Sequence, residues 1–151
     1  MERIVEKLDR YLEQKDFAAA ERHLHYWLSE AEAAGDRRGK LALLNEQIGF
    51  YRKQEQETEA LAAADAARTL VNELDLADTV SGATTLINAA TAYKVFDRAA
   101  EALPLYEKAK MSYERDLPKD DARLGSLYNN MALALCACGR YGEAREMLRK
   151  A

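Results

Sequence analysis

Asparagine and basic side chains recur at matching positions in this sequence. Asn88 and Asn130 lie 42 residues apart, and the same interval separates Arg52 from Lys94. An asparagine amide offers both hydrogen-bond donors and an acceptor, so a row of such amides can pair with the backbone of an extended peptide. Basic side chains beside that row favour an acidic side chain or a carboxylate. The pattern would suit pairing with an extended peptide; ordinary solvated polar positions on a helix surface are the alternative.

The cysteines and histidines do not form a reactive or metal-binding constellation. Cys136 and Cys138 lie two positions apart in one predicted helix and point about 200° apart, so they neither pair nor form a metal clip. We expect both to be small buried residues. His23 and Trp27 are spaced to touch in packing, while His25 points away. No HExxH motif, glycine-rich phosphate loop, zinc spacing or nucleophilic triad occurs. We therefore expect no enzymatic activity, no metal and no cofactor.

Composition and charge argue against several other classes. A chain of 151 residues fits about one domain. A formal charge of −4 and a sequence pI near 5.3 argue against a sequence-independent nucleic-acid binder, which needs a basic surface. No apolar run approaches the roughly 18–20 residues that span a bilayer, and the N-terminus does not resemble a signal peptide. We expect a cytoplasmic protein with no nucleic-acid or membrane partner.

The elements that position the polar columns are predicted to be helices. Apolar residues recur at i, i+4 and i+7 throughout, and the alternation typical of strands is absent. Gly35 is expected to end a helix, with Asp36 and Asp78 as N-caps of later helices. Pro104 predicts some local distortion. The expected helices span residues 2–14, 17–34, 37–54, 57–75, 78–95, 98–116, 120–138 and 141–151.

Columns of apolar residues at intervals of 40 to 42 group these helices into pairs. The most informative column contains only alanine: Ala20, Ala60, Ala102 and Ala144. Helix axes approach to about 8–10 Å only where the contact residues permit it, so these positions are predicted to be helix crossings. A single pair cannot bury its apolar face alone, so neighbouring pairs stack. We expect an all-α solenoid of stacked antiparallel helix pairs.

The columns resemble the tetratricopeptide repeat, whose pattern is Trp-x2-Leu-Gly-x2-Tyr, then Ala-x3-Phe, then Ala. The last unit carries it best, with Tyr128, Met131, Ala132, Ala144, Leu148 and Ala151 at those positions. The 42-residue interval, with EALPLYEKA at Glu101–Ala109 and LYNNMA at Leu127–Ala132, is similar to the kinesin-light-chain-like subgroup. The resemblance implies one domain over 1–151, a right-handed superhelix of eight helices. The four implied repeats span about 2–35, 37–76, 78–117 and 120–151, the last being truncated.

In the family that this chain resembles, the first helix of each pair lines a concave ligand groove. The resemblance therefore implies a scaffold that binds an extended peptide or a partner's helix. Two alternatives stay open: a peptide-sensing fragment of a larger signalling protein, and a structural self-association module. The candidate groove residues are Asn45, Arg52, Lys53, Asn88, Thr91, Lys94, Asn129 and Asn130.

The last predicted helix has an apolar edge. Leu148, Ala144 and Met147 are expected to be uncovered there, although a stacked-repeat protein needs a polar outer face at its end. We therefore expect either a longer array of repeats or a homodimer through the C-terminal helix.

Overall fold

The computed structural model describes residues 1–151, and all of its regular structure is helical. The expectation of an all-α fold with eight helices is confirmed, and each predicted boundary lies within two residues of the observed one. The helices are α1 (Glu2–Glu13), α2 (Phe17–Ala33), α3 (Arg37–Lys53), α4 (Glu57–Glu73), α5 (Val80–Val95), α6 (Ala99–Asp116), α7 (Ala122–Ala137) and α8 (Tyr141–Lys150).

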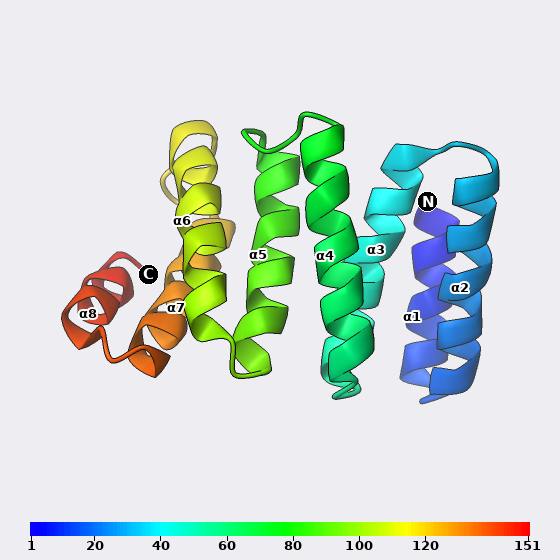
Figure 1. Ribbon diagram of the computed structural model, residues 1–151, viewed down its shortest axis with the longest axis horizontal. Helices are drawn as coiled ribbons and strands as arrows, with labels where there is room; N and C mark the ends of the chain where they lie inside the picture. Colours follow the sequence, from blue (N-terminus) through cyan, green and yellow to red (C-terminus); the bar gives the residue numbers. More distant parts are fainter.

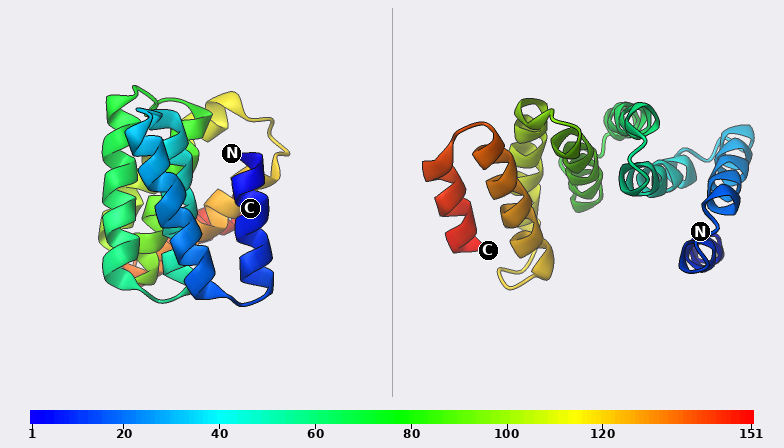
Figure 2. Two further views of the ribbon diagram at one scale, coloured as in Figure 1. Left: turned by 90° about the vertical axis from the view of Figure 1, so that its right-hand side faces the viewer. Right: turned by 90° about the horizontal axis from the view of Figure 1, so that it is seen from below.

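Consecutive helices run antiparallel and form a row of four pairs (Figure 1). Viewed along the helix axes, the row forms two layers and is curved (Figure 2). Helix α5 contacts both α3 and α7 within one layer, whereas α4 and α6 contact only helices of the other layer. Helix α1 contacts only α2. The inner layer that could hold a ligand is therefore formed by α3, α5 and α7.

Small side chains hold the two layers together. Ala20, Ala60 and Ala102 are fully buried, and Ala144 is 2% exposed. Larger side chains fill the space beside them, with Tyr93 and Tyr106 almost completely buried. This burial is what the alanine column predicts, because only a small residue permits close approach of the helix axes.

Residues with a left-handed backbone conformation follow the ends of helices, and polar side chains cap the starts of the next ones. Gly35 ends α2 with φ of +67°, and the Asp36 carboxylate accepts a hydrogen bond from Gly39 N–H at 2.9 Å, so both predictions are confirmed. The same geometry ends α1, where Lys15 has φ of +56° and Asp16 N–H donates to the Tyr11 carbonyl at 2.9 Å. This pairing satisfies carbonyls that the last helical turn leaves free.

The prediction of Asp78 as an N-cap is wrong. Thr79 caps α5, because its extended backbone lets its hydroxyl accept from Gly82 N–H at 3.0 Å. The same hydroxyl donates to the Leu76 carbonyl at 2.7 Å. A Cβ atom on Gly82 would lie 1.8 Å from that carbonyl oxygen, so only glycine fits. Asp78 lies in the preceding turn.

Three further expectations concern Pro104, the two cysteines and the apolar edge of α8. Pro104 lies within α6 and does not interrupt it. Proline has no N–H to donate to the Ala100 carbonyl, and both residues are exposed, so that carbonyl lies on the solvent side of the helix. Cys136 is exposed rather than buried, because it lies on the face of α7 opposite the core, whereas Cys138 is half-buried. In α8, Ala144 is buried in the core, as the alanine column predicts, so it is not part of the uncovered apolar edge that was also expected there; Leu148 is 53% exposed.

Candidate functional site

Three polar stripes face one another across the inner layer. Each follows helical spacing of three, four or seven residues, which places its members on one face of a helix. They line two adjoining cavities of about 550 and 240 Å³ that share Asn45 and Asn88. The stripes are Arg38, Ala42, Asn45, Gly49 and Arg52 on α3; Ser81, Thr84, Asn88 and Thr91 on α5; and Arg123, Ser126 and Asn130 on α7.

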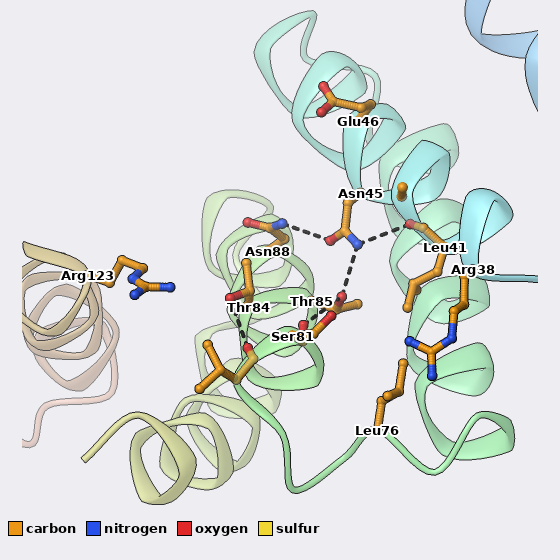
Figure 3. Close-up of a pocket in the computed structure, with 12 residues that line it drawn as sticks. Arg38, Leu41, Asn45, Glu46, Leu76, Ser81, Thr84, Thr85, Asn88 and Arg123 are labelled. Atoms are coloured by element: carbon orange, nitrogen blue, oxygen red, sulfur yellow. Dashed lines mark hydrogen bonds between the residues drawn. The ribbon is translucent and has the colours of Figure 1, made fainter. Parts of the chain in front are cut away.

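The two shared asparagines are hydrogen-bonded to each other (Figure 3). Asn88 Nδ2 donates to Asn45 Oδ1 at 2.8 Å. Asn45 Nδ2 donates to the Leu41 carbonyl at 3.0 Å and to Thr85 Oγ1 at 2.9 Å. Both N–H donors of Asn45 are therefore used inside the protein, whereas Asn88 keeps its carbonyl oxygen and one N–H available to a ligand.

Two cations lie together at the narrower end of the groove. Arg52 lines the smaller cavity, and burial and the Arg52 charge both lower the pKa of Lys94. Lys94 Nζ donates to Asn130 Oδ1 at 2.8 Å. Neither Arg52 nor Lys94 forms an ion pair with a carboxylate. Both cations could form charge-assisted hydrogen bonds with a carboxylate, so this end of the groove is suited to an anionic group.

Tyrosines of α6, in the outer layer, form hydrogen bonds with threonine hydroxyl groups of α5. Thr91 Oγ1 and Tyr106 Oη are 2.8 Å apart, and Thr84 Oγ1 and Tyr113 Oη are 2.6 Å apart. Burial raises the pKa of Tyr106, while the Thr91 hydrogen bond and the Arg52 charge oppose that change. The groove wall is thus positioned by hydrogen bonds from within the protein.

The structure brings most of the predicted site residues together. Lys53 lines a different cavity of about 290 Å³ between α1 and α3. Asn129 is exposed and lines no cavity of the groove. Arg38 was missed by sequence reasoning, although it lies seven residues before Asn45 and fourteen before Arg52, and this spacing was the signal.

One carboxylate lines the groove. Glu46 lies on α3 between the larger cavity and the α1 cavity. Burial and the Asp9 charge raise its pKa, and the Lys53 charge lowers it. No group of three or more His, Cys, Asp or Glu side chains is placed to hold a metal ion. None of the helices combines the length and apolar character needed to cross a membrane.

The curved row of helix pairs defines the fold as a helical-repeat solenoid with a tetratricopeptide-like arrangement. Residues 124–151 match the family model of the tetratricopeptide repeat. The predicted resemblance to tetratricopeptide repeats is confirmed by this match, and solved structures that share the fold include a kinesin-light-chain protein.

Three crystal structures illustrate that likeness. BtubC (BKLC) from P. vanneervenii has a TM-score of 0.89 and 21% identity, covering 99% of this chain and 59% of that one. The putative kinesin light chain of Podosopora anserina, with nearly identical TPR-like repeats, has a TM-score of 0.89 and 19% identity, covering 99% and 72%. A variant of that same kinesin light chain has a TM-score of 0.90 and 19% identity, covering 99% and 71%. Comparison with curated proteins gives no significant match.

Proposed function

We propose that this protein is a non-enzymatic scaffold that binds an extended, partly acidic peptide in its inner groove. Tetratricopeptide-like repeats are in general protein-interaction modules, which supports the class of function. The observation that carries the proposal is the pair of cations at Arg52 and Lys94, which have no carboxylate partner. A carboxylate from a partner protein would complete their hydrogen bonding.

The lining of the groove favours an extended peptide over a partner's helix. Helix-in-groove binding depends on apolar pockets that receive side chains at helical spacing. Here only four of the twelve residues around the larger cavity and two of the nine around the smaller one are hydrophobic. Asn88 instead keeps its carbonyl oxygen and one N–H, and Asn130 keeps its Nδ2 N–H groups, which match the unpaired N–H and C=O groups of an extended backbone.

Peptide binding to charge variants tests this proposal. Fluorescence anisotropy with labelled acidic peptides should give a measurable Kd for the wild-type chain. Arg52→Ala plus Lys94→Ala should weaken binding by about 10- to 100-fold, because hydrogen bonds to charged groups contribute about 1.5–3 kcal/mol. Lys53→Ala is the matched control, since Lys53 is adjacent to Arg52 but lines the α1 cavity. Equal losses in the two variants would refute the proposal.

The same proposal extends to the location of the protein and to its place in a larger assembly. We place the protein in the cytoplasm, consistent with its composition. A role as the peptide-sensing part of a larger signalling protein uses the same groove and would require an effector domain. The chain spans 59% of the length of the BtubC structure, so a longer repeat array is compatible with this fold.

Self-association through α8 is a separate proposal. Leu148 and Tyr141 are 53% and 66% exposed, and large apolar side chains on one short helix favour contact with a second copy. Light scattering at increasing concentration should show a dimer that Leu148→Glu abolishes. A monomer at all concentrations would exclude it.

A further inference from the structure

We propose that the groove recognises a peptide with two acidic groups, one at each end of the groove. This inference rests on the proposed function, because it assigns a ligand spacing to the same site. Its basis is a second basic side chain, Arg38, which lines the larger cavity. Arg38 lies fourteen positions before Arg52 on the same face of α3, so the two cations mark opposite ends of one stripe.

Arg38 is available to a ligand, in contrast to the basic residues beside it. Arg37 pairs with Glu73, and Lys40 pairs with Glu32 at 3.3 Å, whereas Arg38 forms no ion pair. Figure 3 shows Arg38 on α3 and Arg123 on α7 on opposite sides of the cavity. Two contacts, at 3.0 and 2.8 Å, hold the Arg123 guanidinium to Asp121, so Arg38 provides the unpaired charge at this end.

The middle of the groove offers no comparable anchor for an anion. Asn45 and Asn88 occupy it, and they are hydrogen-bonded to each other at 2.8 Å. The only carboxylate lining either cavity is Glu46, and Figure 3 places it on the far side of Asn45 from Arg38. Positive charge is therefore concentrated at the two ends, and a carboxylate near the centre would meet like charge from Glu46.

The separation of the ends sets the spacing of the ligand's acidic groups. Fourteen helical residues correspond to a rise of about 21 Å. An extended chain advances about 3.4 Å per residue, so about six residues cover that distance. The geometry thus selects an extended segment whose acidic side chains lie about six positions apart, at i and i+6. A ligand helix would need about fourteen residues for the same span.

Binding of designed peptides to the full chain tests the spacing. The probes are fluorescein-labelled peptides of one length in a Gly-Ser-Ala background, with two Glu residues separated by two, four, six, eight or ten positions. A further peptide carries a single Glu. Anisotropy at low ionic strength should show the tightest binding near a separation of six. The preference over separations of two and ten should be about three- to fivefold, the effect of an exposed ion pair.

Two arginine variants identify the second anchor. Arg38→Ala should remove the spacing preference and lower the affinity for every two-Glu peptide to that for the single-Glu peptide. Arg37→Ala, the matched control, should alter neither, because Arg37 pairs with Glu73 outside the groove. If the peptides bind with equal affinity, or if the preference survives Arg38→Ala, the two-anchor inference is wrong and the groove proposal stands. If no peptide binds, both are wrong.

Discussion

Gly82 and Gly49 lie on neighbouring inner helices, yet alanine is expected to have opposite effects at the two positions. At Gly82 a Cβ atom would lie 1.8 Å from the Leu76 carbonyl oxygen and 2.6 Å from its carbon. The backbone must shift to relieve this contact, and such overpacking costs about 1–3 kcal/mol. The shift also disturbs the 2.7 Å hydrogen bond from Thr79 to Leu76, which contributes about 1 kcal/mol.

At Gly49 a Cβ atom would meet no atom within 4 Å, because this position faces the groove. Alanine there gains helix propensity of about 0.5–1 kcal/mol with no steric cost. The same propensity gain offsets part of the loss at Gly82, so Gly82→Ala should be destabilising by about 1–3 kcal/mol in total. The two variants should therefore differ by about 2–4 kcal/mol, although they are the same chemical change.

Urea and thermal unfolding followed by circular dichroism measure the difference. For a chain of this length, 1 kcal/mol shifts Tm by about 2–4 °C, so Gly82→Ala should melt lower than wild type and Gly49→Ala slightly higher. Gly125 also has open space around it and serves as a second control. If Gly82→Ala is as stable as Gly49→Ala, the close approach of α5 to the Leu76 carbonyl is not a feature of the folded protein.

The remaining predictions concern the packing of the helix core and the ionisation of a buried tyrosine. Ala102→Leu should overpack the crossing of α5 and α6 and lower the free energy of unfolding by about 1–3 kcal/mol, measured by urea unfolding; an unchanged midpoint would contradict the pairing. Burial and the adjacent Glu21 raise the pKa of Tyr51 to about 12, so the folded state retains a proton that the unfolded chain releases near pH 10. Stability should therefore fall between about pH 10 and pH 12, and Tyr51→Phe should make that fall shallower. Tyr26→Phe, at an exposed position, should leave the fall in stability unchanged. An identical pH profile of stability for wild type and Tyr51→Phe would contradict the assignment to Tyr51.

The sequence was sufficient for the helices and their pairing because both depend on short-range chemistry. Ala60 and Ala102 recur at a fixed interval, and glycine at position 35 with aspartate at 36 is a recognisable helix boundary. The sequence alone did not decide whether Asp78 or Thr79 is the N-cap of α5. Both are good capping residues, and the backbone conformation imposed by the loop from Leu76 decides between them.

The candidate groove was only partly predictable for a different physical reason. Helical spacing places Asn45, Asn88 and Asn130 on related faces, but it does not show which amides are already hydrogen-bonded. Asn45 uses both donors inside the protein, while Asn130 accepts from Lys94. Lys53 follows Arg52 in sequence, and the 100° turn between consecutive helical residues directs it toward the cavity beside α1.

Internal pairing of the asparagines restricts how this groove can select a ligand. Amide–backbone hydrogen bonds exchange with water and contribute only about 0.5–1.5 kcal/mol each, and any peptide can form them. Asn45 offers no N–H to a ligand, since both of its donors are occupied. Discrimination between partners must therefore come from the unpaired cations Arg38, Arg52 and Lys94 and from the position of Glu46 between them. Because the like charge of Glu46 opposes acidic residues at the centre, the groove should reject a uniformly acidic segment more strongly than its net positive lining suggests.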